Sequence, residues 1–491
     1  MKQGIENLEF WFIAGSQFLY GEETLNQVEK NSRIIVDSLN ASGHLPWRIK
    51  FKGIVKTSTD ATEFSREANY DKKCAGLIVF CHTFSPSKMW ITGLKSLEKP
   101  YLHLHTQFNS NIPNEEIDMD YMNLHQSAHG DREHGFIVTR LRIPRKIVVG
   151  HYEETEVQEN IAKYMRAAVG AAFSRDMRVM RFGDNMREVA VTEGDKVEAQ
   201  IKLGWEVNTW AVGLLVDTMN EVTEDEIAAQ VDIYHELYDF NTDKIETIQY
   251  QAREEIAIKK LLDDQGCSAF SNTFEDLYGM DQLPGLATQD LMRQGYGYGG
   301  EGDWKVSAMT SIMKAMSFGL ANGTSFMEDY TYDFENGLIL GAHMLEVCPT
   351  VASDRPRIEV HELGIGGKQP PARIVFNGKG GNGIAVSLID MGGRLRLIVA
   401  DIECVEPTQT MPNLPVARVM WKPEPNLKVG AHAWILAGGA HHTVLSLDLD
   451  AEIMRDFANI LGIEFVHISK DTDLATFEDE LQLKDLLWKL K

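Results

Sequence analysis

Short apolar runs alternate with amphipathic helical patterns along the amino-terminal part of this chain, and few folds accommodate that order. The run from Glu9 to Gly15 predicts a buried strand, and residues 22–40 carry an apolar helical stripe. Gly76 to His82 and Tyr101 to His105 predict further strands. Strands separated by helices form a parallel sheet with helices on its faces. We therefore expect an α/β domain at the amino end.

The same order returns in the middle of the chain and then stops. Lys146 to Tyr152 and Val179 to Asn185 predict strands, and Thr223 with Glu226 predicts a capping box before another helical stripe. From about Thr324 onward, short alternating runs are separated by glycine-rich turns, which is typical of antiparallel strands. The predicted fold class is α/β, with two doubly wound parallel-sheet domains followed by a β-rich, barrel-like C-terminal domain.

Length and composition set the number of domains and the kinds of partner. The chain has 491 residues, too many for one core, and the changes of pattern place the domains at residues 1–177, 178–323 and 324–491. A formal net charge of −24 opposes binding to nucleic acid or an anionic membrane and suits a small-molecule substrate. The sequence shows no membrane span, no secretory signal and no CxxC pair among its five cysteines. We expect a cytoplasmic protein with reduced cysteines.

The segment GYGYGGEGDWK, residues 295–305, holds the first candidate for a functional site. It contains a GxGxxG string, which is typical of dinucleotide-binding loops. The residues before it predict a helix where such a loop needs a strand, and no acidic residue stands at the ribose-binding offset. We interpret the segment instead as a tight loop that places Glu301, with Asp303 as the cap of the following helix.

Four potential metal ligands lie in segments that are otherwise small, apolar or glycine-rich. They are Glu301, Glu328, His343 and one of the pair His441 and His442. Carboxylate oxygens and imidazole nitrogens suit a borderline-hard divalent cation such as Mn2+. Each residue also has a structural interpretation, because two glutamates are often unrelated surface residues and a histidine in an apolar segment is more often part of the core.

Spacing alone leaves the arrangement of these residues open. The helix predicted after Glu301 spans ~24 Å, so the chain must double back before Glu301 and Glu328 can meet. Neighbours on an extended segment point to opposite faces, so we expect only one of His441 and His442 to face a given site.

His343 lies in a segment, LILGAHMLEV, that predicts a strand. Alternation along that strand would place Leu345 and Val347 on the side of His343 and Glu346 on the opposite side.

Two other classes of protein explain part of this pattern. A glycoside hydrolase uses two carboxylates, but it needs no pair of histidines. A non-catalytic sugar-binding protein would account for the α/β domains, but it needs no metal. The sequence contains no HExxH, CxxC or GxSxG motif that would favour a zincin, a zinc finger or a serine hydrolase.

Long segments along nearly the whole chain together resemble the L-arabinose isomerase family of bacterial aldose–ketose isomerases. The segments around Glu301 and Glu328 belong to this resemblance, with WFIAGSQFLYG, CHTFSPSKMW, MDYMNLHQSAHGDREHGF, RFGDNMREVAVTEGDK, HELGIGGK and WILAGGAHHTV. The family has two α/β domains and a β-rich domain, as predicted here. The resemblance further implies a homohexamer or another homo-oligomer, with sites completed by neighbouring subunits.

The resemblance also implies roles for individual residues. It implies that one divalent metal ion per subunit, usually Mn2+ with other divalent ions as alternatives, is held by Glu301, Glu328, His343 and His442. It implies substrate contacts from Gln17, Tyr20, Phe84, His129, Met186, Phe274, Ile365 and His441. Among these, Phe84 and His129 resemble the family residues that approach the pocket of a neighbouring subunit.

The implied activity is the interconversion of L-arabinose and L-ribulose in L-arabinose catabolism, with D-galactose as a second expected substrate. This reaction removes a proton from C2 of the open-chain sugar and returns one at C1. Our hypothesis is that Glu301 and Glu328 divide the base and acid roles across a cis-enediol, while the metal ion acts as a Lewis acid. A metal-assisted hydride shift is the alternative mechanism.

Overall fold

The structure is a computed structural model that describes residues 4–364, 366–409 and 411–490. The described chain forms two compact units, residues 4–172 and 173–490, which meet within α6 (Thr155–Ser174). The domain boundaries at 177 and 323 stay predictions. Within the described ranges, no helix is both long enough and apolar enough to cross a membrane.

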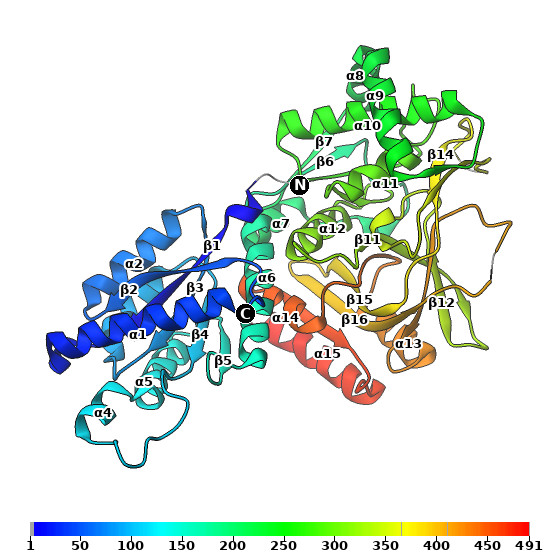
Figure 1. Ribbon diagram of the computed structural model, residues 1–491. Coiled ribbons are helices and arrows are strands. Elements are labelled where there is room, and N and C mark those ends of the chain that lie inside the picture. The colour runs from blue at the N-terminus through cyan, green and yellow to red at the C-terminus, as the bar shows by residue number, and fades with distance from the viewer. Residues whose placement is uncertain (1–3, 365, 410, 491) are drawn as a thin grey trace. The chain divides into compact units, whose positions relative to one another are not determined.

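The amino-terminal unit is the predicted doubly wound α/β domain (Figure 1). Five parallel strands lie in the order β2-β1-β3-β4-β5. The strands are β1 (Glu9–Gly15), β2 (Arg48–Val55), β3 (Cys74–Cys81), β4 (Tyr101–His105) and β5 (Lys146–Val149). The helices before α6 are α1 (Gly21–Ala41), α2 (Ser58–Tyr70), α3 (Ile91–Ser96), α4 (Met119–Leu124) and α5 (Ser127–Arg140). The expected strands at 9–15, 76–82, 101–105 and 146–152 are therefore confirmed.

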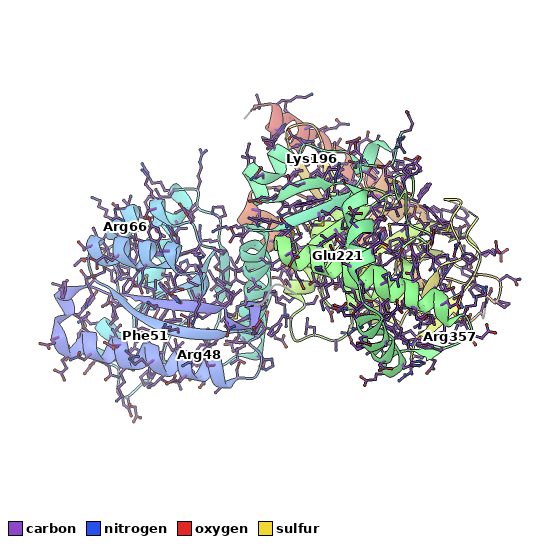
Figure 2. All side chains as sticks on the ribbon, turned by 90° about the horizontal axis from the view of Figure 1, so that it is seen from above. Arg48, Phe51, Arg66, Lys196, Glu221 and Arg357 are labelled. Carbon is purple, nitrogen blue, oxygen red and sulfur yellow. The ribbon has the colours of Figure 1, made fainter. Side chains whose placement is uncertain are left out.

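Alternate residues of β1 face two different helical layers. Trp11 and Ile13 pack in a cluster with side chains of α2, α3 and α5, whereas the ring of Phe10 packs edge-on against Tyr164 of α6. Successive side chains of a strand point to opposite faces, so a continuous apolar run fits a strand that helices cover on both sides. Figures 1 and 2 show α1 and α2 on opposite sides of this sheet.

The second unit begins with another parallel sheet, in the order β10-β9-β6-β7. Its strands are β6 (Arg178–Phe182), β7 (Glu206–Trp210), β9 (Ala269–Asn272) and β10 (Gly297–Gly299). Its helices are α7 (Lys196–Leu203), α8 (Val212–Glu221), α9 (Glu224–Leu237), α10 (Ile245–Gln265), α11 (Gly285–Arg293) and α12 (Trp304–Met316). The predicted capping box of Thr223 and Glu226 is present at the start of α9. Helix α12 is buried along its whole length beside β10 and β9.

The carboxy-terminal part builds a ring of strands. Around the ring the order is β15-β18-β11-β12-β17-β16, and β16 pairs back with β15. All neighbours in the ring are antiparallel, and one outer strand, β19, adds to β16 in parallel. The strands are β11 (Thr324–Asp333), β12 (Leu338–Ala342), β15 (Gly381–Asp390), β16 (Leu395–Val405), β17 (Arg418–Pro423), β18 (His442–Ser446) and β19 (Glu464–Ile468). The predicted change to antiparallel strands at Thr324 is confirmed.

Three helices accompany the ring: α13 (Leu427–Ala437), α14 (Ala451–Leu461) and α15 (Leu474–Lys489). A small additional sheet has the order β14-β13-β8. Its strands are β8 (Asp239–Phe240), β13 (Arg357–Val360) and β14 (Ala372–Val375).

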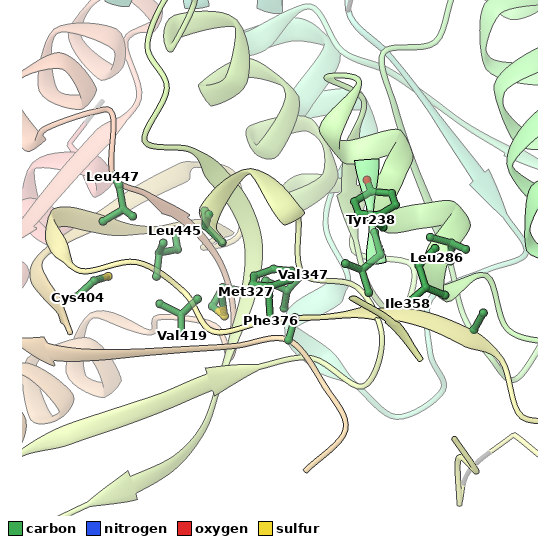
Figure 3. Close-up of a cluster of buried hydrophobic side chains, with 14 of the residues drawn as sticks. Tyr238, Leu286, Met327, Val347, Ile358, Phe376, Cys404, Val419, Leu445 and Leu447 are labelled. Atoms are coloured by element: carbon green, nitrogen blue, oxygen red, sulfur yellow. The ribbon is translucent and has the colours of Figure 1, made fainter. Parts of the chain in front are cut away.

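One hydrophobic core joins the central helices to the ring, as Figure 3 shows. Tyr238 and Leu286 come from the helical part, whereas Met327, Val419 and Leu445 come from strands of the ring. All five side chains are almost completely buried. Apolar side chains from both sides of residue 323 therefore share one core, which holds the loops of the parallel sheet against the ring.

Candidate metal centre

The loop between β10 and α12 places Glu301. Glu301 and Gly302 follow one another with φ angles of 60° and 77°, so the chain turns sharply through the left-handed region. For a glutamate this conformation costs ~1 to 3 kcal/mol and is typical of functional sites. A Cβ atom on Gly302 would lie 2.5 Å from Cα of Asn185, and one on Gly300 would lie 3.1 Å from Nε2 of His343. These glycines therefore serve close packing around Glu301.

Strand pairing brings Glu328 next to two histidine-bearing segments. On β11, Glu328 stands directly opposite His442 of β18 and Ala342 of β12. Residues directly opposed in antiparallel strands present their side chains on the same face. His343 follows Ala342, and its Nε2 lies 3.8 Å from Oε2 of Glu328. The chain thus doubles back after α12, as the spacing between Glu301 and Glu328 requires.

The strand predicted through His343 is wrong, because β12 ends at Ala342. After His343 the chain bends, and Glu346 folds back so that its Oε2 accepts a hydrogen bond from Nδ1 of His343. The same oxygen accepts a second hydrogen bond from the N–H of Leu345, at 3.1 Å. Glu346 is buried on the side of His343, contrary to the alternation that we expected. This carboxylate holds the bend that interrupts the strand.

The ring of His442 is fully buried, and its two nitrogens have different surroundings. Nδ1 lies 3.3 Å from Oδ2 of Asp303. Because an ionised carboxylate only accepts hydrogen bonds, Nδ1 carries the hydrogen. Nε2 has no hydrogen-bond partner within the described chain and lies 3.8 Å from Oε2 of Glu301. Through its other oxygen, Asp303 caps α12 as predicted, accepting from the N–H groups of Lys305 and Val306.

His441 and His442 both approach Glu301, so the prediction that only one of them faces the site is wrong. Strand β18 begins at His442, and His441 therefore precedes the pleated segment and does not follow its alternation. Nε2 of His441 lies 3.7 Å from Oε2 of Glu301. The potential ligand atoms of Glu301, His441 and His442 lie within 4.8 Å of one another, which makes these three residues a possible metal-binding group.

The charges of these side chains stabilise one another. The nearby imidazole of His441 lowers the pKa of Glu301, and the charges of His442 and His343 add to this effect against burial. The carboxylate of Glu301 in turn raises the pKa of His441. Burial acts to lower the pKa of His343, but the carboxylate of Glu346, with the charges of Glu328 and Glu301, outweighs it and the pKa is raised. The carboxylates thus favour positive charge on the neighbouring imidazoles, and a divalent ion at the same place would supply that charge instead.

The chemistry of the two imidazole–carboxylate pairs fits a divalent metal ion. In each pair a buried carboxylate fixes the Nδ1–H of a histidine and leaves Nε2 turned toward a glutamate. Metal-binding histidines commonly have such outer carboxylates. These roles of Asp303 and Glu346 were not predicted from the sequence. Asp303 lies two residues from the candidate ligand Glu301 and Glu346 three residues from His343, and this proximity could have indicated them.

Among the other candidate residues of this unit, Met186 contacts the loop of Glu301. The N–H of Met186 donates to the carbonyl of Glu301 at 2.9 Å, so Met186 is a direct neighbour of the glutamate loop. Phe274 lies in the segment after β9, and its Cβ is 3.8 Å from the position of a Cβ on Gly366. Ile365 lies outside the described residues.

In the amino-terminal unit, four candidate residues and Gln126 form what we call the N-terminal patch: Gln17, Tyr20, Phe84, Gln126 and His129. The rings of Phe84 and His129 stack with centroids 4.5 Å apart. Nδ1 of His129 lies 3.2 Å from Oε1 of Gln126, whose Nε2 donates to the hydroxyl of Tyr20 at 3.1 Å. Gln17 precedes the short helix η2 (Phe18–Tyr20) that carries Tyr20. The sequence analysis did not single out Gln126.

The N-terminal patch lies where the order of the parallel strands reverses. Gln17 follows the carboxyl end of β1, and Phe84 follows the carboxyl end of its neighbour β3. From β1 the chain passes to β2 on one side, whereas from β3 it passes to β4 on the other side. Open α/β sheets bind ligands in the crevice at the point where the connections diverge in this way.

Three family models match the chain in order. They are described as the L-arabinose isomerase N-terminal domain, at residues 4–176, the central domain, at residues 178–319, and the C-terminal domain, at residues 323–464. The chain is 56% identical to the L-arabinose isomerase of Anoxybacillus flavithermus, over 98% of both chains. It is 56% identical to that of Clostridium beijerinckii and 54% identical to that of Thermotoga maritima, in each case over 99% of both chains.

Proposed function

Because the chain belongs to the L-arabinose isomerase family and is an isomerase, we propose that it interconverts L-arabinose and L-ribulose by metal-dependent proton transfer. One observation carries the metal dependence. His442 and His343 each have Nδ1 held by a buried carboxylate and Nε2 turned toward a glutamate, 3.8 Å away. A purely structural pair of histidines has no need of this shared orientation.

We assign the metal ion to Glu301, Glu328, His343 and His442. Two carboxylates and two imidazoles suit Mn2+ or a similar divalent ion. The side chain of His441 is 37% exposed and that of His442 is 0% exposed, so we assign His441 to a sugar hydroxyl and His442 to the ion. When bound, the ion supplies Lewis-acid stabilisation of the negative charge that develops on the sugar oxygens.

Glu301 and Glu328 carry the proton transfers in this proposal. One carboxylate accepts the proton from C2 of the open-chain aldose while the carbonyl oxygen at C1 takes up a proton, which gives a cis-enediol. The second step delivers a proton to C1 and removes the proton from the hydroxyl at C2, which gives the ketose. Each carboxylate needs an oxygen that reaches the sugar for this general acid–base role. The imidazole of His441, 3.7 Å away, lowers the pKa of Glu301 and so favours the ionised carboxylate that such a task needs.

Ketose formation from L-arabinose tests the proposal. Purified protein is assayed after treatment with EDTA and again after addition of Mn2+, with Glu301→Ala and Glu328→Ala as variants. We expect activity to be lost with EDTA, to return with Mn2+ and to be absent from both variants. Full activity of both variants, or indifference to the chelator, would contradict the assignment.

An isotope experiment tests the proton-transfer step separately. The reaction is run in deuterium oxide, and the L-ribulose is analysed by NMR at C1. Incorporation of solvent deuterium at C1 is expected, because a carboxylate exchanges its proton with solvent between the two steps. L-Arabinose deuterated at C2 that passes all of its label to C1 would show a hydride shift instead.

The resemblance supports four further parts of the proposal. The four candidate residues of the N-terminal patch, Gln17, Tyr20, Phe84 and His129, would contact the sugar. Of these, Phe84 and His129 would serve the site of a neighbouring subunit in a homohexamer or other homo-oligomer. The protein would act in the cytoplasm, in L-arabinose catabolism. D-Galactose would be a second substrate, because one additional hydroxymethyl group changes the fit by only ~1 to 3 kcal/mol. Size-exclusion chromatography with light scattering tests the assembly, and competition between the two sugars tests the substrate range.

A further inference from the structure

A buried carboxylate in the amino-terminal unit joins three parts of the chain at the carboxyl edge of the sheet. Asp131 lies in the second turn of α5 and is 2% exposed. Oδ1 accepts hydrogen bonds from the backbone N–H of Cys81, at the end of β3, and from Nε2 of His103, each at 2.9 Å. Oδ2 accepts from Nδ1 of His105, also at 2.9 Å. Both histidines belong to β4.

These contacts fix α5 against the end of β3. The residue before Asp131 is Gly130, and a Cβ on it would lie 2.2 Å from the carbonyl oxygen of Thr83. At Gly130 the helix therefore touches the backbone of the segment just after β3, and at Asp131, one residue later, it is hydrogen-bonded to the last residue of the strand. No other residue type fits this contact without moving the helix.

The two segments that are joined here carry the aromatic pair of the N-terminal patch. Phe84 follows Thr83 directly, and His129 precedes Gly130 directly. The stacked rings of Phe84 and His129 thus stand beside the joined backbones of β3 and α5. A shift of α5 along β3 would separate the rings and move Gln126, which starts the same helix.

We infer that Asp131 is a positioning residue for sugar binding, which holds His129 and Gln126 in register with Phe84 through its hydrogen bonds to Cys81, His103 and His105. This inference rests on the proposed function, since it gives the N-terminal patch a sugar to bind. Asp131 acts through the patch and does not touch the sugar. Its role differs from that of the metal ligands, all of which belong to the other compact unit.

The structure predicts different results for two substitutions of Asp131. Asp131→Ala leaves two buried donors, those of Cys81 and His103, and the partly exposed donor of His105 without an acceptor, which is the costly way to lose a hydrogen bond. Asp131→Asn can keep all three contacts: the amide oxygen accepts from Cys81 and His103, and the amide nitrogen donates to His105 once that ring carries its hydrogen on Nε2. The asparagine variant is therefore the conservative replacement, and it tests shape and hydrogen bonding apart from charge.

The experiment compares steady-state kinetics with L-arabinose in saturating Mn2+. For Asp131→Ala we expect KM to rise about tenfold while kcat stays within about threefold of the wild-type value. The substitution would weaken contacts that are made equally with the substrate and the transition state, and it would leave the chemical step unchanged. Asp131→Asn should have a KM close to that of the wild type. The Mn2+ affinity measured by calorimetry should be unchanged in both Asp131 variants. Asn69→Ala is the matched control, because Asn69 makes two backbone hydrogen bonds between α2 and the segment before β4, with Ser96 and Glu98.

Each outcome decides the inference. A KM unchanged in Asp131→Ala, or raised equally in Asn69→Ala, overturns it, because the effect would then be one of general stability. A parallel loss of Mn2+ affinity also overturns it. If Asp131→Ala does not fold, Gly130→Ala tests the same contact with the carboxylate intact, and a normal KM in that variant refutes the positioning role. A wild-type protein that forms no ketose refutes the proposed function, whereas an active wild type with a normal KM in the variants refutes only the role of Asp131.

Discussion

Replacing Asp303 by asparagine isolates the contact that orients His442. Asparagine has the shape of aspartate, so its carbonyl oxygen can still cap α12 by accepting from the N–H groups of Lys305 and Val306. Its amide nitrogen then stands where Oδ2 accepted from Nδ1 of His442, and a donor faces a donor. His442 must move its hydrogen to Nε2, the atom turned toward Glu301. In that tautomer Nε2 has no lone pair for a metal ion.

We expect the substitution to weaken metal binding more than folding. Outer carboxylates of metal-binding histidines contribute ~10- to 100-fold in affinity, which equals about 1.4 to 2.8 kcal/mol. The contact between Asp303 and His442 is 3.3 Å, longer than a typical charge-assisted hydrogen bond, so the lower half of that range applies. Asp303 also pairs with Nζ of Lys305 at 3.3 Å, but Nζ keeps its hydrogen bonds to the carbonyls of Thr192 and Glu193. The Kd for Mn2+ should therefore rise about 10- to 30-fold.

Calorimetric titration of Mn2+ into EDTA-treated protein measures this change, and thermal melting in EDTA measures stability. Asp195→Asn is the matched control, because Asp195 caps α7 through the N–H groups of Val197 and Glu198 in the same way as Asp303 caps α12. Wild-type affinity in Asp303→Asn would refute the argument that this carboxylate sets the tautomer of His442. An equal loss of affinity in both variants would assign the effect to helix capping.

Three further predictions follow from the buried acids. Glu346→Gln should raise the Kd for Mn2+ ~10- to 100-fold, because Glu346 orients His343, and an unchanged titration would contradict this. Burial raises the pKa of Glu254 in the folded protein, so as pH rises above ~4.5 this carboxyl ionises in the unfolded chain before it does so in the folded one, and stability falls. The gain in Tm from Glu254→Gln should therefore grow from pH 4 to pH 8. A gain that stays constant with pH would refute the argument. The hydrogen bond to Asp131 raises the pKa of His105 in the folded protein. The protonated imidazole therefore stabilises the fold fully below pH ~6.5, and this stabilisation is lost as pH rises through the folded pKa. The difference in Tm between wild type and Asp131→Asn should be larger at pH 5 than at pH 9.

Much of the α/β architecture followed from local pattern. The strands β1 and β4 and the capped helix α9 have strong periodicity or clear end signals, and all three are present as predicted. Strand β2 was not predicted, although Arg48, Lys50 and Lys52 alternate with Ile49 and Phe51 in the period of a half-exposed strand. It is an edge strand with one neighbour, and charged residues are common at sheet edges.

The types of the site residues were visible in the sequence, whereas their convergence was not. Carboxylates and imidazoles in apolar segments identified Glu301, Glu328 and His343 as candidates for one site. Their approach depends on the register that places Glu328 opposite His442, and a one-residue slip of β18 would turn His442 to the other face of the strand. Register between strands more than a hundred residues apart is set by tertiary packing, so no local pattern reports it.

The two wrong predictions at the site, for His343 and His441, have one physical cause. Both assumed that strand alternation continues through the histidine, but β12 ends one residue before His343 and β18 begins one residue after His441. At a strand end the pleat no longer fixes the side chain, and another contact must do so. For His343 that contact is Glu346, three residues further along the chain. For a histidine at a strand end, as His343 shows, a buried acid a few residues away therefore reports the orientation of the ring better than the periodicity of the strand does.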